Sequence, residues 1–146
     1  MFYGEYEHTL DKKSRFIIPA KFREAIKDNN TKNFYITRGL DSCLFLFTEE
    51  EWRRQEQRFK SQSFTKSAAR HFNRLFFSGA SEIVCDAQGR VLIPHYLKEF
   101  AQIERDIVVI GVSNRIEIWG KDKWKAFYAN TREHFEETAE KLMDLE

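Results

Sequence analysis

The sequence lacks several features that would place it in a well-defined class. It has no run of about 18 apolar residues, so no membrane-spanning helix is expected, and residues 1–5 lack the basic and apolar regions of a secretory signal. We therefore expect a soluble cytoplasmic protein with no membrane partner. Only two cysteines occur, Cys43 and Cys85, each in an apolar run without a CxxC partner. Reduced, buried thiols are favoured over the alternatives, a disulfide or a metal site.

Motifs of catalysis are also missing. The chain has no GxSxG, no HExxH and no glycine-rich phosphate loop, and its four histidines lie far apart in sequence. We expect no enzymatic activity, no cofactor and no small-molecule substrate. Charge of one sign is not in excess either, because the net charge is +1, which argues neither for nor against a polyanionic partner.

What the chain does contain is a duplicated unit of ten residues. Leu10–Pro19 reads LDKKSRFIIP and Cys85–Pro94 reads CDAQGRVLIP. Corresponding positions differ by a constant 75, as in 86 − 11 and 94 − 19. The two prolines are the only ones in the chain, and proline suits the end of a strand or the first turn of a helix. Both copies are therefore expected to end a strand and start a helix.

The duplication continues beyond the prolines. Phe34–Thr37 corresponds to Ile107–Ile110, and Cys43–Phe47 corresponds to Arg115–Trp119. Each half thus reads β-β-α-β-β followed by a helical stretch, which predicts an α+β fold that is mainly β. We expect the halves, residues 1–77 and 78–146, to interlock as one compact unit, because half units of four short strands are small and an isolated hairpin is only marginally stable in water.

Two helices outside the repeated strands have clear signals. Thr48 and Glu51 have the spacing of a capping box, in which the threonine side chain and the glutamate side chain each satisfy a backbone N–H of the first turn. Asp122–Leu142 carries an apolar stripe at helical spacing, which predicts one amphipathic helix packed with that stripe inward.

Charge is unevenly distributed along the chain. Between Lys12 and Lys27 there are six basic residues and one acid, Glu24, whereas Ala129 to Glu146 holds six acids and two basic residues. This asymmetry predicts a basic face that could meet nucleic acid, and an acidic end that avoids it or pairs with a neighbouring subunit.

Taken together, these patterns resemble the MraZ family, whose members are related to the AbrB-type transition-state regulators. The similarity covers nearly the whole chain, with one departure, since the family usually has glycine where Ser14 stands. The residues that carry it are Met1-Phe2 followed by Gly4, His8–Arg15, Phe77–Glu82, Asp86, Gly89–Pro94 and Ile116–Trp119.

The resemblance implies a swapped-hairpin AbrB-like barrel built from two tandem β-β-α-β-β repeats, with Asp11–Phe47 related to Asp86–Trp119 by pseudo-two-fold symmetry. It also implies ring-shaped homo-oligomers and sequence-specific binding of double-stranded DNA upstream of the bacterial division and cell-wall gene cluster, hence a nucleoid-associated regulator. Because one subunit of net charge +1 can neutralise few phosphates, we expect the operator to consist of short direct repeats that several subunits engage together.

The chemistry for DNA binding lies in the duplicated turns. Arginine can hold phosphate or guanine in a bidentate way and lysine acts as a point charge, so the candidate DNA-binding residues are Lys12, Lys13, Arg15 and Arg90. Asp11 and Asp86 are expected to orient the arginine or hold the turn, and Gly89 to allow a positive φ.

Two alternatives stay open at this point. The Asp–Arg pairs could serve only to hold the fold, an interpretation that has more weight for Arg90, because Ala87 and Gln88 replace the lysines in its turn. The whole protein could also be an oligomeric scaffold that does not bind specific DNA.

Overall fold

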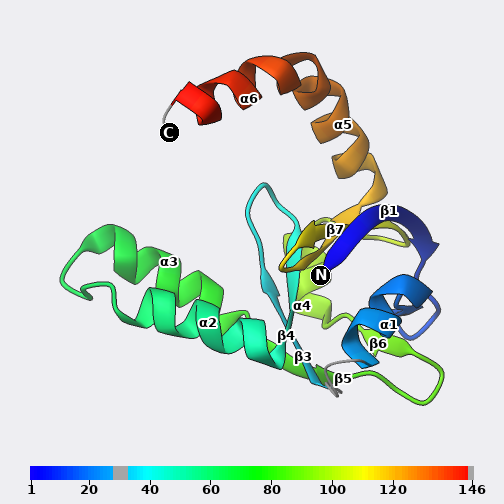
Figure 1. Cartoon of the computed structure of the whole chain (residues 1–146). Coiled ribbons are helices and arrows are strands. Elements are labelled where there is room, and N and C mark those ends of the chain that lie inside the picture. Colours follow the sequence, from blue (N-terminus) through cyan, green and yellow to red (C-terminus); the bar gives the residue numbers. More distant parts are fainter. Residues whose placement is uncertain (28–32, 145–146) are drawn as a thin grey trace.

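The computed structural model describes residues 1–27 and 33–144, and the elements follow the same order in both halves (Figure 1). The first half contains β1 (Phe2–Thr9), β2 (Arg15–Ile17), α1 (Ala20–Lys27), β3 (Asn33–Arg38), β4 (Leu44–Thr48) and α2 (Glu49–Lys60). Helix α3 (Ser67–Ser78) forms a hairpin with α2 and leads to the second half. That half contains β5 (Ser81–Val84), β6 (Arg90–Leu92), α4 (His95–Phe100), β7 (Asp106–Ser113), β8 (Ile116–Gly120) and α5 (Lys121–Thr131). A 3₁₀ turn, η1 (Arg132–His134), and α6 (Phe135–Asp144) end the described chain. The tandem β-β-α-β-β repeats predicted from the duplication are therefore confirmed.

The strands of the two halves interleave. The larger sheet has the order β1-β7-β8-β4-β3-β5. Exchanging each strand for its counterpart in the other half gives the same order read from the opposite edge, as a two-fold relation requires. The register agrees with the duplication: Phe34 lies opposite Ile83, and its counterpart Ile107 lies opposite His8, the counterpart of Ile83. In the smaller sheet β2 pairs antiparallel with β6, and Phe16 lies opposite its own counterpart, Val91.

The closed barrel expected from the family resemblance is not formed by strand pairing in the described residues. Strands β1 and β5 are the two edges of the larger sheet, and β2 and β6 form a separate sheet. The reason is local. Strands β2 and β6 have only three residues each, and turns separate β2 from β1 and β6 from β5. The two short strands therefore form their inter-strand hydrogen bonds with each other.

Both faces of the large sheet are covered. Strand β4 alternates between two clusters: Leu44 and Leu46 belong to the core beneath α1, α4 and the small sheet, whereas Phe45 and Phe47 belong to an aromatic cluster on the other side. Successive side chains of a strand point to opposite faces, so a strand covered on both sides is apolar throughout. Trp52 of α2 lies in the aromatic cluster, stacked on Phe76 and Tyr35.

Helix α2 begins as predicted at Thr48, whose Oγ1 accepts a hydrogen bond from the Glu51 N–H at 3.3 Å. The reciprocal half of the capping box is absent from the hydrogen bonds of the described residues. The Glu51 carboxylate instead accepts bonds from Arg54, Gln55 and Asn114. These three donors compete successfully for the side chain that the sequence pattern assigned to the helix start.

The prediction of one helix over Asp122–Leu142 with its stripe packed inward is wrong in two respects. The α-helix is interrupted by the 3₁₀ turn η1, and Figure 1 shows the bend between α5 and α6. Trp124 and Phe127 do pack on Trp119 of β8, but every residue from 128 to 144 is exposed. The first two turns of α5 are therefore packed against the sheet, whereas α6 is not packed against any described part of the subunit. Within the described residues, none of the helices has the length and apolar content needed to cross a lipid bilayer.

Candidate nucleic-acid interface

The first duplicated turn is organised by one carboxylate. Asp11 Oδ1 accepts hydrogen bonds from the N–H groups of Lys13 and Arg15, both at 2.9 Å, and Oδ2 accepts one from Arg15 Nε at 2.9 Å. The Ser14 N–H donates to the Asp11 carbonyl and closes the turn. An aspartate favours this position because its side chain reaches backbone donors two and four residues on.

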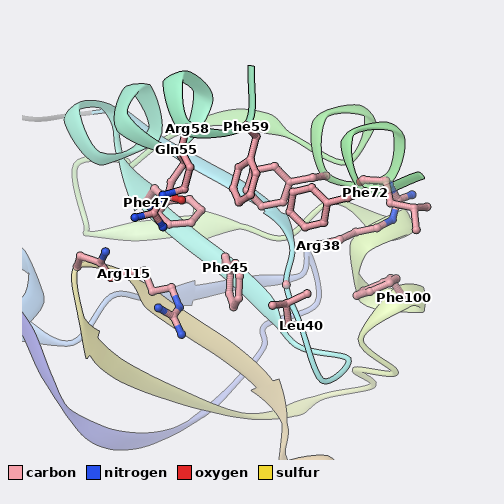
Figure 2. Close-up of a pocket in the computed structure, with 14 residues that line it drawn as sticks. Arg38, Leu40, Phe45, Phe47, Gln55, Arg58, Phe59, Phe72, Phe100 and Arg115 are labelled. Atoms are coloured by element: carbon pink, nitrogen blue, oxygen red, sulfur yellow. Dashed lines mark hydrogen bonds between the residues drawn. The ribbon is translucent and has the colours of Figure 1, made fainter. Parts of the chain in front are cut away.

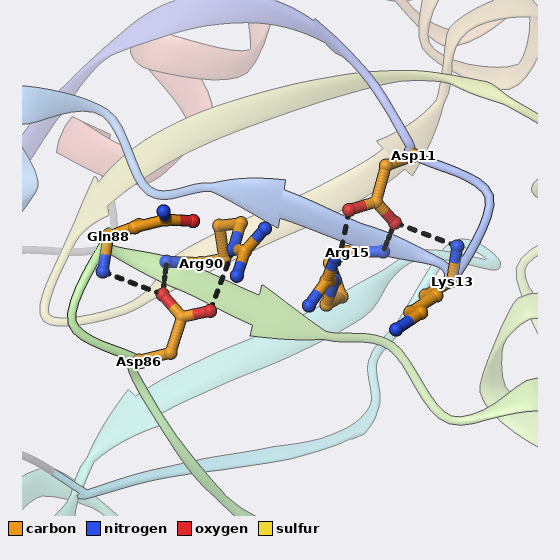
Figure 3. Close-up of polar contacts among 6 residues, drawn as sticks. All are labelled: Asp11, Lys13, Arg15, Asp86, Gln88 and Arg90. Atoms are coloured by element: carbon orange, nitrogen blue, oxygen red, sulfur yellow. Dashed lines mark hydrogen bonds and ion pairs between the residues drawn. The ribbon is translucent and has the colours of Figure 1, made fainter.

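The second turn repeats this geometry. Asp86 accepts hydrogen bonds from the N–H of Gln88 at 2.9 Å, the N–H of Arg90 at 2.8 Å and Arg90 Nε at 2.7 Å (Figure 3). The hydrogen bond from the Arg90 N–H lowers the pKa of Asp86, and that from the Arg15 N–H lowers the pKa of Asp11, with the guanidinium groups adding to both effects. Both carboxylates are therefore held ionised, and each fixes the arginine four residues later.

Each turn is completed by the other half of the chain. The Ile18 N–H donates to the Gly89 carbonyl, and the Ile93 N–H donates to the Ser14 carbonyl, both at 2.9 Å. Gly89 has a φ of 81° and Ser14 has a φ of 62°, so the two turns share a left-handed residue at the same place. The positive φ predicted at Gly89 is therefore confirmed. Ser14 adopts the same left-handed conformation in the first copy, although glycine adopts it at lower steric cost.

The two arginines lie on one face of the small sheet. Phe16 and Val91 point into the core, and the opposite face carries Arg15 beside Leu92 and Arg90 beside Ile17. The exposed fractions are 24% for the Arg15 side chain and 30% for the Arg90 side chain. The result is a two-fold symmetric face with two arginines on one diagonal and two exposed apolar residues, Ile17 and Leu92, on the other.

Each guanidinium group uses only one of its nitrogen atoms in the pair with its aspartate. Asp11 and Asp86 occupy the Nε atoms, and among residues 1–27 and 33–144 the Nη1 and Nη2 atoms of Arg15 and Arg90 make no hydrogen bond. These two nitrogens form the end of the guanidinium fork that can hold two acceptor atoms at once. The ion pair therefore orients each arginine without using up its capacity to bind.

Of the other predicted site residues, Lys12 and Lys13 are exposed in the first turn. The structure adds one residue that sequence reasoning left out of the site, Arg23 of α1. It lies against Gly89 and shares a shallow pocket of about 420 Å³ with Arg15 and Arg90. Arg23 was visible only as a member of the basic run, and its position over the turn of the other half depends on the tertiary fold.

Comparison with known proteins agrees with this geometry. The family described as "MraZ protein, putative antitoxin-like" matches the chain twice, over residues 1–75 and 76–146. A protein of Desulforamulus reducens named "Transcriptional regulator MraZ" is 47% identical over 145 residues, which are 99% of either chain. The name is that of a regulator and not of an enzyme, in agreement with the missing catalytic motifs. These matches confirm the resemblance drawn from the duplicated turns: the chain belongs to the MraZ family.

Proposed function

We propose that this protein is a sequence-specific DNA-binding transcriptional regulator and that the exposed face of β2 and β6 reads the DNA. The observation that carries the proposal is the pair of equivalent arginines on that face, each oriented by an aspartate and each with Nη1 and Nη2 available. The name of the similar Desulforamulus protein supports the same class of function.

The geometry suits the major groove of duplex DNA. A two-stranded β-ribbon fits that groove, and an arginine fork matches the O6 and N7 acceptors of guanine. Ile17 and Leu92, which lie beside the arginines, offer apolar contacts of the kind that thymine methyl groups accept. Lys12 and Lys13, which are exposed in the turn before β2, would neutralise phosphates at one end of the ribbon.

Affinity is expected to come from assembly. A subunit of net charge +1 neutralises few phosphates, so a homo-oligomeric ring that engages several short direct repeats would supply avidity on the order of 10²–10⁴. We further propose that the interleaved strands correspond to the swapped-hairpin AbrB-type arrangement. The expected operator lies upstream of the division and cell-wall gene cluster, so the protein would act in the cytoplasm at the nucleoid.

The test is binding to DNA fragments from that upstream region carrying one, two or three direct repeats. We expect affinity to rise steeply with repeat number, and Arg15→Ala and Arg90→Ala each to abolish most of the binding while leaving the oligomer intact by light scattering. Equal affinity for one and three repeats would contradict the multivalent mechanism. Full binding by an assembled Arg15→Ala protein would remove this face from the interface.

One observation favours a second candidate, an oligomeric scaffold without specific DNA binding, namely the exposed apolar residues of α6. Gel shifts with specific and scrambled duplexes at two salt concentrations separate the two functions. A scaffold would show no preference between the duplexes, and any binding would vanish at the higher salt concentration.

A further inference from the structure

Helix α6 has no partner among the described residues of its own chain. It has ten residues, all exposed, and Phe135 and Leu142 are 72% and 65% exposed. Isolated helices shorter than about 12–15 residues are marginal in water, and most helices in proteins are stabilised by packing an apolar face. A partner surface outside the described fold would supply the packing that α6 lacks.

The sequence of α6 separates into two faces. Positions 135, 139, 142 and 143, which are Phe, Ala, Leu and Met, fall on one side of the helix at the spacing of a packed face. The other side carries four acids and one lysine. The acids are Glu136, Glu137, Glu140 and Asp144. A surface that accepts this helix must therefore be apolar along its centre and basic at its edges.

The molecule offers such a surface between the α2–α3 hairpin and the sheet. A groove of about 400 Å³ is lined there by aromatic rings from four elements (Figure 2). The rings include Phe45 of β4, Phe59 of α2, Phe72 of α3 and Phe100 of α4. Leu75 of α3 also lines the groove and is 58% exposed. Exposed apolar side chains over a concave aromatic lining are typical of a site for another apolar surface.

The groove is opposite in charge to α6, because its lining residues include Arg38, Arg58 and Arg115 and no acid. The α2–α3 hairpin beside it is also basic. The segment from Gln57 to Ser81 contains five basic residues and no acid. The basic residues are Arg58, Lys60, Lys66, Arg70 and Arg74. Arg58 lines the groove itself, and no ion pair of its side chain occurs within the described part of the chain. It is thus placed to meet a carboxylate on a docked helix.

We propose that α6 of one copy of the chain docks in the aromatic groove of a second copy. Trp124 and Phe127 anchor α5 on Trp119, and Figure 1 shows α6 and the α2–α3 hairpin as separate projections of the same subunit. Because the helix and the groove are different surfaces, the contact is heterologous. After one contact, one subunit of the pair still has a free groove and the other still has a free helix. Such contacts form a ring when the rotation closes. The inference rests on the homo-oligomer of the proposed function and assigns its interface.

The test uses two full-length variants that each lose one side of the contact. Phe135→Asp with Leu142→Asp removes the helix side, and Leu75→Asp removes the groove side. These side chains are exposed, so the subunit is expected to fold in both variants, which circular dichroism and thermal melting verify. Lys141→Asp, on the charged face of α6, is the matched control.

We expect the wild type and Lys141→Asp to assemble, and each disrupting variant to be a monomer of 17.5 kDa by native mass spectrometry. An equimolar mixture of the two disrupting variants retains one intact helix and one intact groove, so it should form a dimer of twice that mass and nothing larger. Disrupting variants that assemble like the wild type, or a mixture that stays monomeric, would overturn this interface while leaving the proposed function in place. A monomeric wild type would overturn the interface and the proposed oligomer together.

Discussion

The ammonium group of Lys98 donates a hydrogen bond to the hydroxyl of Ser14 at 2.9 Å, across 84 residues of sequence. The equivalent contact in the other half is that of Arg23 with Gly89, since 98 − 75 is 23 and 14 + 75 is 89. Each half of the chain therefore covers the Asp–Arg turn of the other half with a basic side chain from the helix after its proline. The positions of the two turns, and of the arginines they hold, are coupled by this exchange.

Gly89→Ala should destabilise the protein by about 1–2 kcal/mol, because a side chain in the left-handed region incurs that cost. Gly89 has a φ of 81°, and an added Cβ would lie 3.0 Å from Arg23 Cδ. Urea denaturation measures the change. The same substitution made in an Arg23→Ala background is the control. That background lacks the steric contact with Arg23, so most of the destabilisation by Gly89→Ala should persist if the backbone conformation causes it. An unchanged unfolding midpoint would show that the turn relaxes without cost.

Acid should loosen the two turns only below the ordinary aspartate range. The pKa of Asp11 lies below its usual value of 3.8, chiefly because its carboxylate accepts the Arg15 N–H. A lowered folded-state pKa means that the stabilisation is present above the unfolded value and is lost as the pH falls through the folded value.

An NMR titration of the Lys13 and Arg15 amides tests this pH dependence. The amide shifts should move with a midpoint below 3.8, and the Gln88 and Arg90 amides should do the same for Asp86. Asp11→Asn should abolish the first titration and leave the second intact. A midpoint at or above 3.8 would mean that the turn hydrogen bonds do not favour the charged form.

Replacing Lys12 and Lys13 by alanine should flatten the salt dependence of DNA binding. Each lost phosphate contact removes about 0.9 from the slope of log K against log salt concentration, so about two units per engaged subunit are expected. Gln88→Ala, at the position of the second turn that matches Lys13, is the control and should leave the slope unchanged. Fluorescence anisotropy at a series of salt concentrations gives both slopes. Identical slopes for the lysine variant and the wild type would exclude these lysines from phosphate contact.

The two thiols should differ in reactivity. Burial raises the pKa of both, but Cys43 is fully buried and its thiol donates to the Leu40 carbonyl at 3.1 Å, whereas Cys85 is only partly buried. Alkylation of the native protein should therefore label Cys85 first, and Cys43 only after unfolding. Peptide mass spectrometry at timed intervals measures the order. Labelling of native Cys43 as fast as Cys85 would contradict the burial of Cys43 next to the start of β4.

Features that depend on neighbours within a few residues could be predicted from the amino-acid sequence alone. The Asp11–Arg15 and Asp86–Arg90 pairs form inside five-residue turns, so the motif spacing was enough to predict the turns and the orientation of the arginines. Proline geometry likewise placed a strand end and a helix start at Pro19 and Pro94. The constant offset of 75 residues made the second half predictable from the first.

Features that depend on contacts between distant residues became known from the folded structure. The interleaved strand order, the open edges at β1 and β5, and the placement of Arg23 over Gly89 all depend on pairing between halves, which hydrophobic periodicity does not encode. The same holds for the C-terminal helix: its stripe predicted burial, but Trp119 contacts only the part near Trp124 and Phe127. A periodic apolar pattern shows that a face needs a partner, and the partner itself is a property of the assembled fold.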